Sequence, residues 1–316
     1  MGGRVGIAGA LAILFLQGLT WATEPVAVLT EIRAGPGELR VRRAGEASWI
    51  APQLLASLRP GDQIRALGNG RAVLVFSANG GTEVVSAANS PYTVRPPAAQ
   101  TGTEKVRSLV ASVADFLLGS QRELTYHSLS LRGPGRTTPF IISPRESRML
   151  PGPVTFEWGG PDALQYRVRV VGPDGLLWEG AGLPRRPLLY PPEAPPLRAG
   201  ARYVWELEAK GYPVEWTQFE LLKGFEATRV QEALNLLQTG TPAAYPRNTS
   251  VLLRAGLLLQ NRCYDAARHE LLAGIKADQD EPTLHLLLGR VYERTGLKEL
   301  AAEAFQDAQS RLNRTP

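Results

Sequence analysis

The sequence predicts a multidomain protein in which two all-β regions precede an all-α region of helical repeats. Short apolar segments that alternate with polar residues and are separated by turn residues fill residues 24–97 and 137–222. The hydrophobic period changes to 3.6 residues at Phe225, and the chain beyond it matches itself at a spacing of 34 residues. At one domain per ~150 residues, a chain of 316 residues is long enough for two or three domains.

Composition excludes several classes of protein before any element is placed. The chain has 44% hydrophobic and 21% charged residues, which is ordinary for a globular protein and excludes collagen-like, disulfide-scaffold and disordered chains. Lys and Arg number 35 against 30 acidic residues, and the longest basic cluster is Arg40, Arg42 and Arg43. No run of five to eight basic residues interleaved with aromatics occurs, so we expect no nucleic-acid partner.

Residues 1–22 have the pattern of a signal peptide. Arg4 precedes an apolar stretch over residues 5–16, and Thr20 and Ala22 are small residues suited to cleavage after Ala22. An apolar core of about 12 residues is too short to cross ~30 Å of hydrocarbon comfortably. We therefore expect an exported bacterial protein, periplasmic or extracellular, without a membrane span after cleavage; retention of the segment as an anchor is the alternative.

The first all-β region, residues 24–97, carries a specific motif. Residues 58–65 read Leu-Arg-Pro-Gly-Asp-Gln-Ile-Arg, and residues 70–76 read Gly-Arg-Ala-Val-Leu-Val-Phe before a Gly turn. This pattern resembles the FecR domain, with Ala66 where that family often has Thr. The resemblance implies a periplasmic β domain that relays a signal across the membrane, but the cytoplasmic arm of that relay is not expected here. Asp62 is predicted to be a turn former whose carboxylate bonds nearby backbone amides.

A linker over residues 98–136 is predicted to contain one amphipathic helix. Thr101 and Glu104 have the spacing of a capping box. The apolar residues that follow recur at helical spacing: Val106, Leu109, Val110, Val113, Phe116 and Leu117. Few basic residues lie on the polar face, so we expect this helix to pack against a domain and not on a membrane.

The second all-β region, residues 137–222, is predicted to be a sandwich. Residues 166–170 and 203–207 alternate apolar and polar side chains, with an aromatic residue on each core face. Residues 197–203 resemble the tyrosine corner of fibronectin type III domains, which implies that the Tyr203 hydroxyl bonds to the chain a few residues upstream. We expect Trp158 and Trp205 to be core residues; an aromatic sugar-binding platform is the alternative.

The all-α region, residues 225–316, contains two repeat units near 248–281 and 282–315. The second unit reads His285-x2-Leu288-Gly289-x2-Tyr292, then Ala301-x3-Phe305-x2-Ala308. It resembles the tetratricopeptide (TPR) repeat, with His in place of its Trp. Because two such units fall short of the three that usually cover their own apolar faces, we expect the array to dock on the second β region, form a homodimer, or remain open for a partner.

The TPR resemblance assigns a set of inner-face residues as the partner-binding surface. These are Thr249, Leu252, Leu259, Gln260, Thr283, Leu286, Arg290 and Arg294. Arg290 and Arg294 are one helical turn apart and suited to hold a carboxylate; a solvated face braced by Glu293 is the alternative.

No catalytic, cofactor-binding or metal-binding motif is found, so the sequence predicts a protein that is not an enzyme and has no cofactor. Cys263 is the only cysteine, and we expect it to be a small buried hydrophobe. The predicted function is a cell-envelope scaffold that holds a protein partner through its repeats. The alternatives are a module that binds cell wall (peptidoglycan) or another glycan, and a FecR-like envelope sensing component.

Overall fold

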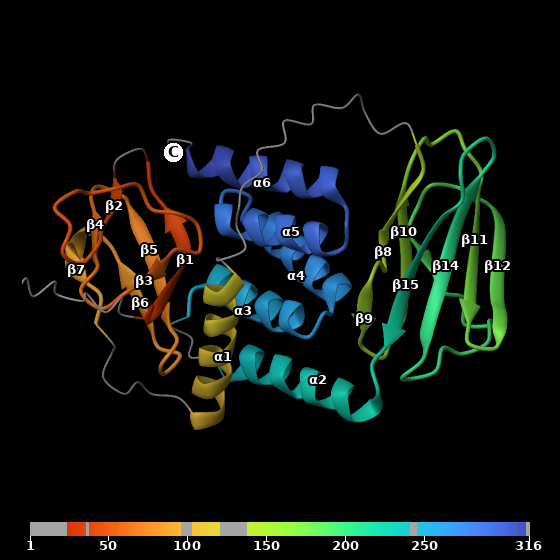
Figure 1. Cartoon of the computed structure of the whole chain (residues 1–316), viewed down its shortest axis with the longest axis horizontal. Coiled ribbons are helices and arrows are strands. Elements are labelled where there is room, and N and C mark those ends of the chain that lie inside the picture. The colour runs from red at the N-terminus through yellow and green to blue at the C-terminus, as the bar shows by residue number, and fades with distance from the viewer. Residues whose placement is uncertain (1–23, 36–37, 96–102, 121–137, 241–244, 314–316) are drawn as a thin grey trace, which may run out of the picture.

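The computed structural model describes residues 24–35, 38–95, 103–120, 138–240 and 245–313. It has an all-β region over residues 27–93, helix α1 (Glu104–Ser120), a β-rich region over 140–221, and five helices over 224–312. The helices lie between the two β regions (Figure 1). No described helix is long and apolar enough to cross a membrane. The predicted signal peptide and Thr101 of the predicted capping box lie outside the described residues.

The N-terminal strands form two antiparallel sheets. The first has the order β3-β1-β5-β6, with β1 (Ala27–Arg33), β3 (Ser57–Leu58), β5 (Arg71–Phe76) and β6 (Thr82–Val85). The second has the order β2-β4-β7, with β2 (Leu39–Arg42), β4 (Gln63–Ala66) and β7 (Tyr92–Thr93), and a 3-10 turn (Ala87–Asn89) precedes β7. The buried Asp62 carboxylate accepts hydrogen bonds from the amides of Arg59 at 3.0 Å and Ala44 at 2.9 Å, which confirms its predicted role in the turn.

The second β-rich region has a five-stranded and a three-stranded sheet. The orders are β12-β11-β14-β15-β9 and β13-β10-β8. The strands are β8 (Phe140–Ser143), β9 (Ser147–Met149), β10 (Thr155–Gly159), β11 (Tyr166–Gly172), β12 (Gly175–Leu183), β13 (Leu188–Leu189), β14 (Arg202–Ala209) and β15 (Glu215–Leu221). Their core contains Trp158 and Trp205, as predicted. The Tyr203 hydroxyl accepts a hydrogen bond from the Arg198 amide at 2.5 Å, which confirms the predicted upstream contact.

The C-terminal helices are one single helix and two pairs. They are α2 (Gly224–Thr239), α3 (Arg247–Gln260) with α4 (Tyr264–Ala277), and α5 (Pro282–Arg294) with α6 (Lys298–Leu312). A Cβ atom at position 289 would lie 2.4 Å from the Phe305 ring, closer than real contacts allow. Gly289 therefore lets α5 and α6 approach closely.

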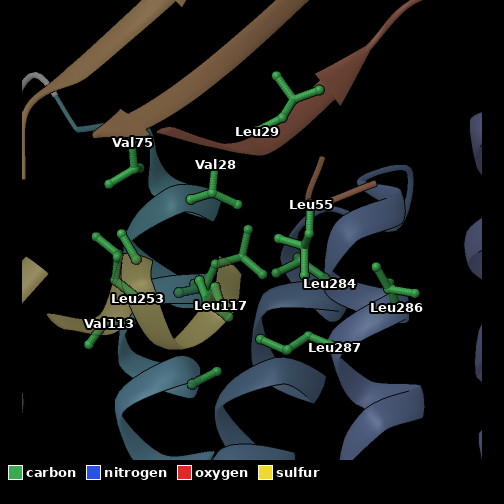
Figure 2. Close-up of a cluster of buried hydrophobic side chains, with 14 of the residues drawn as sticks. Val28, Leu29, Leu55, Val75, Val113, Leu117, Leu253, Leu284, Leu286 and Leu287 are labelled. Carbon is green, nitrogen blue, oxygen red and sulfur yellow. The ribbon is translucent and has the colours of Figure 1, made fainter. Parts of the chain in front are cut away.

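The predicted fold class, three separate domains in series, is wrong, because the described residues form two hydrophobic cores instead of three. One core combines the N-terminal sheets, the apolar face of α1 and the C-terminal helices. Figure 2 shows Val28 and Val75 of the sheet beside Leu253 of α3 and Leu117 of α1. The other core belongs to the second β-rich region alone. The first and last regions of the chain are thus one folding unit, with the second β-rich region inserted between them.

The error has a physical reason. Hydrophobic period identifies a strand or helix, but it does not identify the element that covers the apolar face. One signal was present, because residues 72–76 are a continuous apolar run, and such runs occur in strands that are buried on both faces. All five are buried, as are the first six residues of β1. One face of this sheet meets the rest of the N-terminal region, and the other meets the helices.

Candidate functional site

The predicted inner-face residues are mostly covered. Thr249, Leu252, Leu259, Thr283, Leu286 and Arg290 are buried, whereas Gln260 and Arg294 are exposed. Arg290 and Arg294 therefore do not form one exposed pair, although they lie one turn apart on α5. The element that covers this face belongs to the same chain, since β1 contacts α1, α3 and α5.

Hydrogen bonds fix β1 on the start of α3. One oxygen of the Glu31 carboxylate accepts bonds from both the amide and the hydroxyl of Thr249, each at 2.6 Å. The Thr30 hydroxyl lies 3.1 Å from the Thr249 hydroxyl and donates to the Val73 carbonyl of β5 at 3.2 Å. Arg33 at the end of β1 forms an ion pair with Asp278 after α4. The helical array thus binds its own N-terminal sheet through Thr249, one of the residues predicted to bind a partner.

A second buried carboxylate lies at this contact. Glu281 is the N-cap of α5 and accepts a hydrogen bond from the Thr283 amide at 3.2 Å. Its other oxygen has no hydrogen-bond partner among the described residues. Burial and, to a smaller extent, the nearby Glu31 carboxylate together raise the pKa of Glu281 to about 8. Glu281 therefore holds a proton at neutral pH, which limits the repulsion between the two acids.

The sequence contained a signal for one of these two acids only. Glu31 interrupts the apolar segment of residues 26–32, and a charge within an otherwise buried strand requires a partner. Glu281 stands among Asp and Gln residues between two helices and reads as an ordinary loop residue. Nothing in its local sequence shows that a strand 250 positions upstream buries it.

A surface groove runs along the exposed side of α1. It has a volume of about 900 Å³ and is lined by ten residues: Ala78, Asn79, Glu104, Arg107, Ser108, Ala111, Ser112, Asp115, Phe116 and Gln260. Gln260, at the end of α3, belongs to the predicted partner-binding set, and its amide donates to the Ser112 hydroxyl at 3.3 Å. The groove therefore contains one of the two exposed residues of the predicted surface, and it is bordered by α1, α3 and the turn after β5.

A polar contact joins the second β-rich region to α4. The Glu157 carboxylate on β10 accepts hydrogen bonds from Arg268 at 2.9 Å and His269 at 3.1 Å. The bond from His269, with a smaller effect of Arg268, lowers the pKa of Glu157 to about 2. Hydrogen bonds to Asp265 and then Glu157 raise the pKa of His269 to about 10. Both groups are thus charged at neutral pH. They hold together the two bodies of the protein, by which we mean the unit around the shared core and the second β-rich region.

The same contact brings a serine, an aspartate and a histidine together without forming a nucleophilic triad. The buried Ser143 hydroxyl donates to the Asp265 carboxylate, while the imidazole of His269 faces Asp265 and Glu157. A serine nucleophile needs the imidazole to accept its proton, and here the carboxylate occupies that place. These bonds dock the second β-rich region on α4.

Cys263 is fully buried before α4. Burial raises the pKa of its thiol to about 11, so the thiolate that would act as a nucleophile or metal ligand is scarce at neutral pH. No group of three or more His, Cys, Asp or Glu side chains among the residues that the structure describes could hold a metal ion.

A search of protein-family models finds no match to this chain, and no curated protein matches it.

Proposed function

We propose that this protein is a non-enzymatic scaffold of the bacterial cell envelope that presents the groove along α1 to a protein partner. The observation that carries the proposal is the position of Gln260. It is the residue of the predicted inner face that lines an open groove, while six others are buried within the chain.

The surroundings of the groove support a polar peptide segment as the bound part. Glu104, Arg107 and Asp115 supply charges of both signs, and Ser108 and Ser112 supply hydroxyl groups. Phe116 adds an aromatic side chain. Polar groups beside an apolar anchor are the usual make-up of a protein-binding surface.

Site-specific photocrosslinking tests this proposal. A photoreactive side chain at Ser112 should crosslink one protein of discrete mass in envelope fractions. The matched control is the same side chain at Ala163, which is exposed in the second β-rich region and remote in sequence from the groove residues. Equal crosslinking at both positions, or none at Ser112, would contradict the groove as a binding site.

The proposed location is tested separately by amino-terminal sequencing of the exported protein. We expect the mature chain to begin at Thr23, because the Thr20–Ala22 segment is suited to the signal peptidase. A chain that begins at Met1 in a membrane fraction would show that the segment is retained as an anchor.

A further inference from the structure

The β2-β4-β7 sheet carries an arginine face. Val41 and Ile64 are buried on one side of the sheet, so their neighbours in the strands point to the other side. Arg40 lies directly opposite Arg65 in the register of β2 and β4, and Arg42 lies opposite Gln63. Three guanidinium groups therefore share one side of a small sheet, and we call Arg40, Arg42 and Arg65 the arginine face.

Two arginines directly opposite each other on neighbouring strands repel and destabilise a sheet. A second pair in the same region, Arg33 opposite Arg71, shows how such repulsion is relieved, because Asp278 forms an ion pair with Arg33. No carboxylate among the described residues forms an ion pair with Arg40, Arg42 or Arg65. The charge of this face is thus left uncompensated by the described chain.

Trp49 holds two of these guanidinium groups in place. The central carbons of Arg42 and Arg65 lie 4.9 and 4.5 Å from the centroid of its ring. A guanidinium that stacks on an aromatic ring uses its flat face and leaves N–H groups at its edge for an anion. Arg42 uses one such group on the Gln63 side chain, at 2.5 Å. The Nε atom of Arg65 is buried and has no hydrogen-bond partner among the described residues.

We propose that the arginine face binds the acidic groups, carboxylate or phosphate, of a polysaccharide. Preoriented guanidinium edges match the oxygen pairs of these groups. Gln63 and Thr93, on adjacent strands, place neutral hydrogen-bonding groups beside the charges, suited to sugar hydroxyls. This site lies in a different sheet from the groove along α1 and goes beyond the scaffold function.

The edges of the sheet favour a glycan over an extended acidic peptide. A peptide commonly binds by adding a strand to a free edge. Here the amide and carbonyl of Val41 in β2 already bond to Ile50, at 2.9 and 2.8 Å. At the other edge β7 has only two residues and follows Pro91. A ligand must therefore lie across the face and bind by its side groups.

Binding of the mature chain to defined polymers tests the proposal. The probes are polygalacturonate, which carries carboxylates, and phosphorylated dextran, with neutral dextran of equal length as the control. We expect at least one acidic polymer to bind with an affinity that falls as salt rises, and neutral dextran not to bind. The double variant Arg40→Gln with Arg65→Gln should bind at least about 10-fold more weakly, since one charge-assisted contact typically contributes that factor or more.

Two further variants separate recognition from net charge. Arg186→Gln with Arg229→Gln removes the same charge from exposed positions in other elements and should bind within about twofold of the wild type. Arg40→Lys with Arg65→Lys keeps the charge and should keep the fold, but it should still bind several-fold more weakly because lysine lacks the planar fork.

Four results would overturn the proposal. The first is no binding of the wild type to either acidic polymer. The second is equal loss in the face variant and the Arg186/Arg229 control. The third is full affinity in the lysine variant, provided that its thermal midpoint is unchanged. The fourth is equal or tighter binding of poly-glutamate or single-stranded DNA, which would assign the face to an acidic peptide or to nucleic acid.

Discussion

At the scale of single residues, Tyr203 joins the start of β14 to the loop that precedes it. Its hydroxyl is bonded to the Arg198 amide, and its ring stacks on Phe219 at 5.3 Å between centroids. We expect Tyr203→Phe to lower the free energy of unfolding of the second β-rich region by about 1 kcal/mol, the usual net value of one hydrogen bond. Tyr203→Ala should cost roughly 3 to 5 kcal/mol, because it also empties part of the core.

Denaturant unfolding followed by tryptophan fluorescence measures this, since four of the described tryptophans lie in that region. Tyr212→Phe is the matched control, because no described hydrogen bond uses the Tyr212 hydroxyl. Unchanged midpoints in both Tyr203 variants would show that the residue is not part of the core.

Glu281 makes the stability of the shared core dependent on pH. Its pKa of about 8 in the folded protein lies above the ordinary value of 4.5, so the folded state binds more protons between these pH values. The stabilising effect of the neutral acid is fully present below pH ~4.5 and is lost as pH rises through about 8. The free energy of unfolding of the shared core should therefore fall between pH 5 and pH 8.

Urea unfolding followed by helical circular dichroism at several pH values checks this. Glu281→Gln should flatten the fall and gain stability relative to the wild type at pH 8, since an amide stays neutral. The two proteins are best compared below pH 6.5, because the raised pKa of His269 changes the stability only between about pH 6.5 and 10. The same slope in both proteins would show that Glu281 is ionised or solvated in the folded state.

Local contacts and distant ones differ in how far the sequence could predict them. The bond from Tyr203 to Arg198 joins residues five positions apart, and a known local motif describes it. The Glu31–Glu281 contact depends on which strand covers which helix, and only the folded chain determines that. For the same reason, Gln260 could be named as a surface residue from the repeat resemblance, whereas its groove could not be foreseen before α1 was placed.

At the scale of elements, α1 connects the two halves of the shared core. Its buried side chains face the first N-terminal sheet and helices α2 and α3. A Cβ atom at Gly256 of α3 would lie 2.8 Å from a methyl group of Val113, so the helices pack closely. The period of the apolar residues predicted this helix and its buried face, but it carried no information on which surfaces would receive that face.

Leu117→Ala tests the role of α1. The side chain is fully buried, so its loss should cost about 2 to 5 kcal/mol. Because the sheet and the helices share one core, fluorescence of Trp49 and helical circular dichroism should shift together to lower denaturant. In a Trp49→Phe variant, the remaining described tryptophans report on the second β-rich region. Adding Leu117→Ala to that variant should leave their unfolding midpoint unchanged.

Leu67→Ala is the matched control, because Leu67 is half exposed and should change the midpoint little. Separate transitions for Trp49 and for the helical signal in the Leu117→Ala variant would contradict a single shared core.

At the scale of the whole molecule, the two bodies are joined by a polar contact, not by a common core. Interfaces of this kind between domains permit relative motion. Glu157→Gln removes a charge from the contact with Arg268 and His269 and should weaken docking by about 1.5 to 3 kcal/mol, the value of a charge-assisted hydrogen bond. The radius of gyration measured by X-ray scattering should rise, while the unfolding midpoint of each body stays near its wild-type value.

The same contact has a definite response to pH. The lowered pKa of Glu157 makes its contribution present above about 4.5 and lost as pH falls toward 2. The raised pKa of His269 makes its contribution present below 6.5 and lost as pH rises toward 10. An unchanged radius of gyration in Glu157→Gln would show that other bonds, such as that from Arg145 to the Thr295 carbonyl at 2.8 Å, hold the bodies without it.

The insertion of the second β-rich region also has a consequence for biosynthesis. The first half of the shared core ends at Leu117 and the second half begins at Leu222, roughly 100 residues later. At ~5–20 residues per second, a ribosome needs on the order of 5 to 20 seconds to make the intervening chain. During that time the apolar face of β1 and β5 lacks α3 and α5, which cover it together with α1, and this makes the nascent chain prone to aggregation. The length of the inserted region thus determines how long this face of the newly made sheet stays uncovered.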